Sequence, residues 1–205
     1  MTFLTLVRHG QTDWNLERRI QGTTDIPLND TGRDDARTAA ALLAQHTHHA
    51  IYASPLVRAH ETAQIIADQL GLESPQPAPD MREREFGAGE GLLVEEYLET
   101  YRDWQGLPDG AESLDEVRDR AISALDAIAA DARRRSAPQA ESVIVVTHGG
   151  VIRSLLHHVS GGTLPREGEM LRNGSAHRFV AAPGLLRLLD PSVVDAPVTV
   201  DVPAS

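Results

Sequence analysis

The sequence predicts an α/β fold in which a mostly parallel sheet lies between helices on both faces, as a three-layer sandwich. Two short apolar runs, residues 4–7 and 143–146, have the composition of parallel strands that are buried on both faces. Each run leads into a polar His-Gly pair, at His9 and at His148. Because the carboxyl ends of parallel strands meet at one edge of a sheet, we expect both histidines at the edge where α/β proteins bind ligands.

The composition favours one domain and excludes several kinds of chemistry. We expect one domain over residues 1–190, followed by a poorly ordered tail over residues 191–205. The net charge of −11 disfavours nucleic acid or an anionic membrane as the main partner. The absence of cysteine excludes disulfides, thiolate metal sites and a cysteine nucleophile. No long apolar segment opens the chain, so we expect no signal peptide or membrane span and a cytoplasmic location.

Arg8 and His9 follow the first strand, and both residue types suit a phosphate group. A guanidinium offers a planar fork of donors to two phosphoryl oxygens, and a neutral imidazole can attack phosphorus. For these residues alone, a surface arginine and a histidine that caps a turn would be the simpler interpretation. The polar loop over residues 16–27 comes next, and it contains Gln21, Gly22 and Thr23.

The next elements alternate between helix and strand. Helical spacing of alanine and leucine predicts a helix over about residues 31–45, and residues 50–53 form a short strand pattern. A second helix is predicted over residues 56–70, with Gly71 ending it. Arg58 lies in the first turn of this helix, where a cation opposes the helix dipole. A bound anion at that helix end would account for the unfavourable placement.

Three histidines, His46, His48 and His49, follow the first of these helices. A metal cluster is one interpretation of this group. Imidazoles near the negative end of a helix dipole are more typical of a solvated helix end, which is the interpretation we favour.

Residues 81–91 form a charged run that ends in glycines. Such a run often forms a solvated face, but Glu83 and Glu85 would also share one face of an extended segment and compete for the role of a proton donor. A helix is predicted over residues 92–104, where the aromatic residues suit either a core or a cap over the site. We interpret residues 88–112 as a cap insertion. The aromatic residues of this helix are Tyr97, Tyr101 and Trp104.

The last third of the chain supplies scaffold and the second histidine. A capping box at residues 113–116 begins a long apolar-striped helix that runs to about residue 135. The strand over 143–146 leads through His148 into a helix that ends near residue 159. Residues 173–181 and 185–189 form either a closing hairpin or a pair of edge strands.

Four motifs resemble those of the histidine phosphatase superfamily, in its phosphoglycerate-mutase-like group, and they occur in that family's order. They are Leu-Val-Arg-His-Gly at residues 6–10 with Thr12 and Asn15, Ser-Pro and Arg-Ala within residues 54–59, Glu83 to Gly87, and Thr-His-Gly-Gly at residues 147–150. The resemblance extends from about residue 4 to the closing hairpin. It implies the phosphoglycerate mutase-like fold.

The resemblance also implies roles for individual residues. His9 is the nucleophile that becomes phosphohistidine, and Glu83 is the proton donor, which decides between Glu83 and Glu85 by analogy alone. The family often has tryptophan where this chain has Gly89, and we expect an open, glycine-rich wall at Gly87, Gly89 and Gly91. The residues expected to bind the phosphoryl group or substrate are Arg8, Arg58, His148, Asn15, Gln21, Gly22, Thr23 and Gly149.

The residue set itself suits phosphoryl transfer, which needs charge neutralisation, an in-line nucleophile and an acid for the leaving group. Two arginines, two histidines and one glutamate supply these, with one histidine as an imidazolium, so we expect no metal and no cofactor. The predicted function is hydrolysis of small phosphorylated metabolites through a phosphohistidine. A phosphoglycerate mutase is the alternative, which the acidic cap disfavours, and a non-catalytic phospholigand sensor ranks last. Whether the protein is a monomer or a homodimer stays open.

Overall fold

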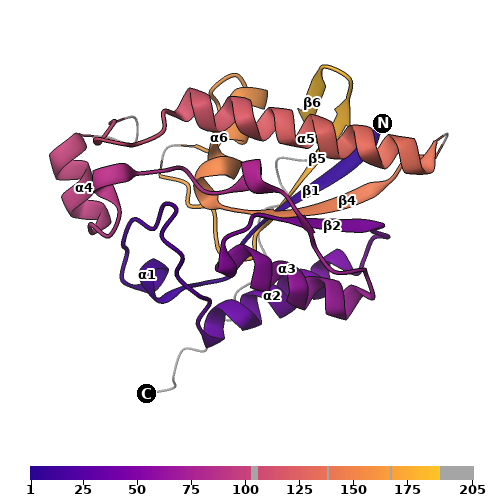
Figure 1. Ribbon diagram of the computed structural model, residues 1–205, viewed down its shortest axis with the longest axis horizontal. Helices are drawn as coiled ribbons and strands as arrows, with labels where there is room; N and C mark the ends of the chain where they lie inside the picture. Colours follow the sequence, from indigo (N-terminus) through magenta and orange to yellow (C-terminus); the bar gives the residue numbers. More distant parts are fainter. Residues whose placement is uncertain (103–105, 138, 167, 190–205) are drawn as a thin grey trace.

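The computed structural model describes residues 1–102, 106–137, 139–166 and 168–189, so Trp104 and the tail predicted over residues 191–205 lie outside the described residues. Figure 1 shows how the elements are arranged. In chain order they are β1 (Thr2–Arg8), α1 (Asp13–Leu16), α2 (Asp30–Leu43), β2 (Ala50–Ala53), α3 (Val57–Leu70), β3 (Gln76–Pro77), η1 (Pro79–Met81), η2 (Gly87–Gly89), α4 (Val94–Tyr101), α5 (Leu114–Ser136), β4 (Ser142–Thr147), α6 (Gly149–Val159), β5 (Ala176–Ala182) and β6 (Leu185–Leu188).

The strands form one mixed sheet in the order β3-β2-β4-β1-β5-β6. Strands β1 to β4 are parallel to their neighbours in this set, whereas β5 runs antiparallel to both β1 and β6. The closing segment is therefore a hairpin, and of its two strands β6 lies at a sheet edge whereas β5 also pairs with β1. The mostly parallel sheet confirms the α/β class that the sequence predicts.

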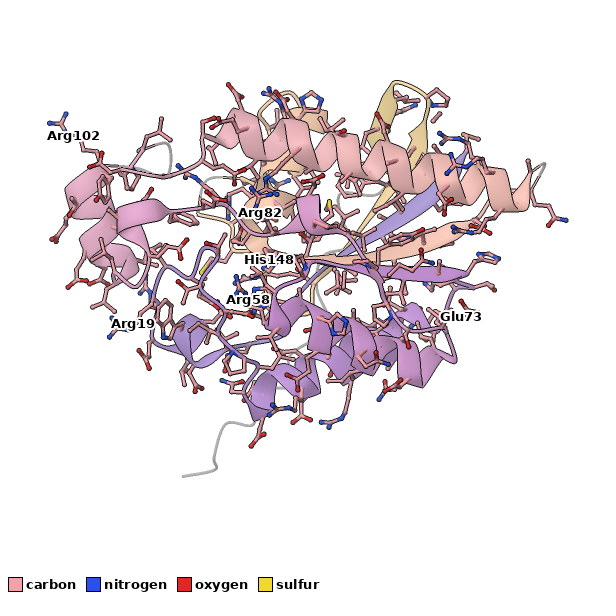
Figure 2. All side chains as sticks on the ribbon, viewed as in Figure 1. Arg19, Arg58, Glu73, Arg82, Arg102 and His148 are labelled. Carbon is pink, nitrogen blue, oxygen red and sulfur yellow. The ribbon has the colours of Figure 1, made fainter. Side chains whose placement is uncertain are left out.

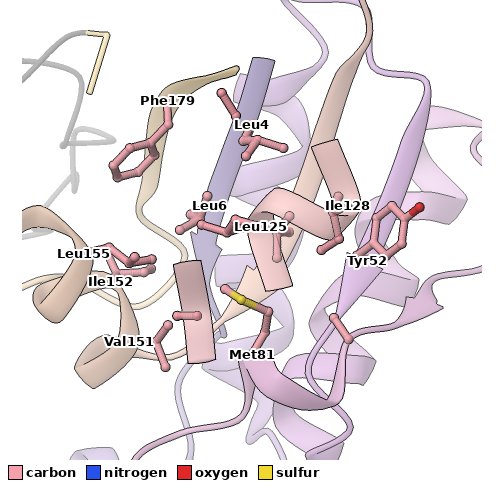
Figure 3. Packing of buried hydrophobic residues seen from close by; sticks show 14 of the residues in the cluster. Leu4, Leu6, Tyr52, Met81, Leu125, Ile128, Val151, Ile152, Leu155 and Phe179 are labelled. Carbon is pink, nitrogen blue, oxygen red and sulfur yellow. The ribbon is translucent and has the colours of Figure 1, made fainter. Parts of the chain in front are cut away.

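Helices cover both faces of the sheet, which confirms the three-layer sandwich (Figure 1). Alternate residues of a strand point to opposite faces, so each strand contributes to two cores. Leu4 and Leu6 of β1 pack with residues of α5 and α6, as Figure 3 shows. Val7 points the other way and packs with residues of α2 and α3. The sheet is thus packed on both faces, and this packing positions its carboxyl edge.

Most predicted elements begin and end within about two residues of the observed ones, because the capping signals are used as expected. The Ser113 hydroxyl accepts the Glu116 amide at 3.2 Å and begins α5. Gly71 ends α3 in the left-handed conformation, with φ of 66°. Four short elements are not predicted by the sequence. They are η1, η2, the helix α1, which Thr12 caps, and β3, which pairs only two residues with β2.

The segment predicted as a cap has a small core of its own. Helix α4 is shorter than predicted, and Tyr97 is its one fully buried residue. Tyr97 packs with Ile20 and Phe86, apart from the two cores of the sandwich. Its ring meets that of Phe86 edge-on, with centroids 5.6 Å apart. In Figure 1 this segment lies at one end of the molecule, beyond the helical layers.

Candidate active site

Two neighbouring parallel strands bring His9 and His148 together. Arg8 at the end of β1 pairs with Thr147 at the end of β4, so the next residue of each strand lies at the same edge. The two imidazole rings have centroids 5.1 Å apart, and both residues are buried. The prediction that both histidines lie at one sheet edge is confirmed.

Hydrogen bonding defines which nitrogen of His9 carries the proton. Nδ1 lies 2.7 Å from the Gly10 carbonyl oxygen, which can only accept, so Nδ1 donates and Nε2 keeps its lone pair. Burial holds the pKa of His9 well below 6.5, and the charges of Arg58 and Arg8 lower it further. His9 is therefore a neutral imidazole whose Nε2 can act as a nucleophile.

The loop after β1 is fixed by contacts that only glycine permits. The Gly10 amide donates to the Thr62 hydroxyl at 3.0 Å, and that hydroxyl donates to the Arg58 carbonyl at 2.7 Å. A Cβ on Gly10 would lie 2.1 Å from the Gly32 carbonyl oxygen at the start of α2. The position of His9 thus depends on close backbone packing against α2 and on a threonine of α3.

Arg58 is fully buried, and Figure 2 shows it beside His148 in the interior of the molecule. One terminal nitrogen donates to the Thr24 carbonyl at 2.9 Å and the other donates to the Gly22 carbonyl at 2.7 Å. Burial lowers the pKa of Arg58, although the carboxylates of Glu83, Asp25 and Glu90 oppose that effect. The cation in the first turn of α3 is therefore held by loop carbonyls.

Three buried nitrogens around His9 have no hydrogen-bond partner in the described part of the chain. They are Nε of Arg8, Nε of Arg58 and Nδ1 of His148. The Arg8 side chain is oriented by a hydrogen bond from Nη1 to the Leu171 carbonyl. Unpaired buried polar groups are destabilising, so clustered donors of this kind are typical of a site built for an anion.

His148 is held by Ser54, a residue that the sequence did not single out for this role. Its Nε2 lies 2.7 Å from the Ser54 hydroxyl, which also accepts the Leu56 amide at 3.3 Å. The hydroxyl proton is thus available to Nε2, which leaves Nδ1 as the donor that faces the site. Burial holds the pKa of His148 well below 6.5, and the positive charge of Arg58 is the next largest cause. In the ligand-free protein His148 is thus held toward its neutral form, and the imidazolium expected opposite a phosphoryl group stays a prediction.

The two competing glutamates lie in different surroundings. The Glu83 carboxylate accepts the Gly150 amide in the first turn of α6 at 3.1 Å and the Arg84 amide at 2.9 Å. Glu85 instead accepts a hydrogen bond from Arg82 at 3.2 Å, and its side chain is 44% exposed. Geometry thus favours Glu83 as the carboxylate of the site.

Arg120 of α5 holds the segment that carries Glu83. It donates to the carbonyl oxygens of Arg82 at 2.8 Å and Glu83 at 3.1 Å. Its own guanidinium is fixed by Glu112, with two contacts of 2.7 and 2.8 Å. This arrangement links the glutamate to the long scaffold helix.

The loop residues predicted to bind substrate are engaged largely with the protein itself. Oδ1 of Asn15 accepts the Thr12 amide at 3.1 Å, and Oε1 of Gln21 accepts the Thr12 hydroxyl at 3.0 Å. The Thr23 hydroxyl donates to Glu90 at 3.1 Å. Gly149 lies beside Arg8, since a Cβ there would be 3.3 Å from Nε of that arginine. Direct contact of these residues with a ligand stays a prediction.

The space left by the glycine that replaces the family's tryptophan is filled. Gly89 is buried, and a Cβ on it would lie 2.8 Å from the ring of Tyr97. The Tyr97 hydroxyl donates to the Gly106 carbonyl at 3.1 Å. The expectation of an open wall at Gly89 is wrong, because the tyrosine packs directly over this glycine.

Two of the three histidines that follow α2 are engaged by Ser142. Nδ1 of His48 lies 3.1 Å from the Ser142 hydroxyl, and Nδ1 of His49 accepts the Ser142 amide at 3.1 Å. Nowhere in the described ranges do three or more histidine or carboxylate side chains group as metal ligands would. The described helices include none long and apolar enough to cross a membrane.

The chain belongs to the histidine phosphatase superfamily (branch 1), whose sequence pattern matches residues 4–189. Enzymes of this superfamily act on small phosphorylated substrates. Some relatives are named as phosphatases and others as phosphoglycerate mutases. Over 162 residues the chain is 40% identical to the uncharacterized phosphatase PhoE of Bacillus subtilis (strain 168), which covers 79% of each protein.

A second relative is named a probable phosphoglycerate mutase. It is GpmB of Serratia proteamaculans (strain 568), 34% identical over 185 residues, covering 84% of this chain and 82% of the relative. Among solved structures, a mycobacterial glucosyl-3-phosphoglycerate phosphatase in complex with VO3 matches with a TM-score of 0.78 at 27% identity. The match covers 92% of this chain and 97% of that one.

Proposed function

We propose that this protein is a metal-independent phosphomonoesterase that acts on small phosphorylated metabolites through a phosphohistidine at His9. The main support is a set of buried donors on Arg8, Arg58 and His148 that surround a neutral His9. Within the described part of the chain these donors have no hydrogen-bond partner. These donors can oppose the charge on the equatorial phosphoryl oxygens without a metal ion. A lone pair on His9 Nε2 supplies the nucleophile.

The proposed reaction has two steps. Nε2 of His9 attacks phosphorus while the bond to the ester oxygen breaks, and protonated Glu83 gives its proton to that oxygen. Water then attacks the phosphohistidine, the Glu83 carboxylate takes the water proton, and phosphate leaves as the bond from phosphorus to nitrogen breaks. In this scheme Gly149 contributes its amide at the start of α6, and the cap, in its described parts over residues 88–102 and 106–112, forms one wall of the site.

The contacts of the cap and first loop favour hydrolysis over mutase activity. A mutase must also bind the carboxylate of its sugar acid, for which arginine is suited. Arg19 is engaged by Glu17 at 2.6 Å and by the Gly91 carbonyl at 3.0 Å. Arg18 lies 3.8 Å from Glu95, and Arg102 projects from the outer end of the cap, far from His148 in Figure 2.

The test is a comparison of phosphate release with isomer exchange. Purified protein is given a panel of phosphorylated metabolites that includes 2- and 3-phosphoglycerate, and both phosphate and isomer are measured. We expect phosphate release from one or more esters without exchange between the two isomers. Faster exchange than release would establish the mutase, and binding without either reaction would establish the non-catalytic sensor.

A further inference from the structure

One carboxylate outside the proposed reaction accepts an unusual number of hydrogen bonds. Oε1 of Glu90 accepts the Thr23 amide at 2.9 Å and hydroxyl at 3.1 Å, and the Phe86 amide at 3.3 Å. Oε2 accepts the Thr24 amide at 3.0 Å and hydroxyl at 2.6 Å. We propose that Glu90 is a positioning residue for Arg58 and acts through the loop over residues 22–24. This proposal rests on the proposed function.

The loop is shaped around this carboxylate. Gly22 has φ of +55°, and a Cβ on it would lie 2.0 Å from Oε1 of Glu90. Burial raises the pKa of Glu90, but the hydrogen bonds from Thr24, Thr23 and Phe86 outweigh that effect and leave the pKa below its usual value. Glu90 is therefore ionised at neutral pH, and its charge is used within the loop.

The loop in turn sets the place of the guanidinium. Both terminal nitrogens of Arg58 donate to loop carbonyls, those of Gly22 and Thr24. Among the described residues the hydrogen-bond partners of its terminal nitrogens are these carbonyls, and the charges of Glu83, Asp25 and Glu90 act on the guanidinium without an ion-pair contact. The amides of Thr23 and Thr24 point to Glu90 while carbonyls of the same loop point to Arg58. Moving the carboxylate would therefore move the arginine.

This role predicts a kinetic pattern that differs from that of the proton donor. Arg58 would contact the phosphoryl group, which is common to every substrate, so its displacement should affect all esters alike. A displacement of about 1 Å in a positioning contact can reduce turnover by about 100-fold. Loss of a proton donor instead weighs on esters with poor leaving groups.

The main test variant is Glu90→Gln, which keeps the shape of the side chain but removes its charge. Its NH2 group would face the donors of Thr23 or Thr24, with which it cannot form a hydrogen bond. We measure kcat/KM for an aryl and an alkyl phosphate and the Kd of inorganic phosphate. We expect all three to worsen by about 10- to 100-fold and to similar extents. The matched control is Glu95→Gln on the neighbouring exposed helix turn, whose side chain is 78% exposed and which should change none of them.

A second variant separates positioning from folding. Thr24→Val removes one hydroxyl donor to Glu90 and leaves the carboxylate in place, so it tests the contact even where Glu90→Gln fails to fold. Both lesions act on one contact, so the double variant should lose less than the product of the single losses. Thermal unfolding of each variant identifies a change in fold.

Three results would overturn the proposal. They are unchanged phosphate affinity in both variants, a loss confined to the alkyl ester, and fully multiplicative effects in the double variant. Phosphate binding needs no turnover, so the two proposals can fail separately. If the wild type hydrolyses no ester but Glu90→Gln still weakens phosphate binding, the positioning role stands and the proposed reaction is wrong.

Discussion

Gly150→Ala gives a direct test of Glu83 because the substitution adds one methyl group against that carboxylate. A Cβ on Gly150 would lie 2.4 Å from Oε1 of Glu83, whereas ordinary contacts begin at 3.4 Å. The carboxylate must therefore retreat by about 1 Å, and a shift of that size in a reacting group can reduce turnover by about 100-fold. Gly150 lies inside α6 without a positive φ, where alanine is the better helix former, so the helix itself should not lose stability.

The assay compares kcat/KM for alkyl and aryl phosphates. Leaving groups such as sugar alkoxides need a proton, whereas an activated phenolate needs far less help. In Gly150→Ala, kcat/KM should therefore fall about 100-fold for alkyl esters and little for aryl ones. Gly149→Ala is the matched control, since its Cβ would meet Arg8 at 3.3 Å and should affect both ester types alike. Equal losses on both esters in Gly150→Ala, or no loss, would refute the placement of Glu83.

Three further expectations concern the nucleophile, metals and acid stability. His9→Ala should abolish turnover and the acid-labile, alkali-stable phosphoryl adduct on the peptide that contains His9, as peptide mapping after rapid quenching would reveal; an adduct elsewhere would reassign the nucleophile. Prolonged chelation should leave activity intact, and loss restored by a divalent ion would contradict the site. Burial lowers the pKa of His177 from 6.5 to about 4. The unfolded chain binds the extra proton first as the pH falls, so the share of stability that neutral His177 contributes should decline between these values by about 3 kcal/mol. In denaturant unfolding, the free energy of unfolding of His177→Gln should decline less steeply with falling pH than that of the wild type. Equal declines in the two proteins would contradict this role of His177.

Local sequence patterns were sufficient to predict the strands that carry the two histidines. The apolar runs at β1 and β4 are continuous, so their strands and the two His-Gly ends could be located, and parallel pairing then required His9 and His148 to meet. Capping residues are likewise local signals, so the helix ends could be located from the sequence. Strand β3 was missed because two residues that include Pro77 carry no periodic signal.

The supporting contacts of the site could not be predicted, because they join segments far apart in the chain. Ser54 reaches His148, and Glu90 reaches Thr24, through pairings that no spacing in the sequence reveals. In the sequence Glu90 is one acidic residue among several in the cap, whereas in the structure it is enclosed by donors. The packing of Tyr97 over Gly89 is a tertiary contact without a local signal. Polar residue types were visible in the sequence, but their partners depend on the folded chain.

The place of β1 in the sheet also decides when the enzyme can form during synthesis. Phe3 pairs with Ser142 on one side and Val180 on the other, so the strand that leads to His9 is synthesised well before either of its partners. Contacts so distant in sequence form slowly, and the unpaired apolar strand is exposed to aggregation meanwhile. Nascent chains that stop short of β5 therefore hold every residue of the proposed site without the frame that aligns them. Chaperones that shield β1 should raise the yield of active protein, and activity should appear only after β5 has been synthesised.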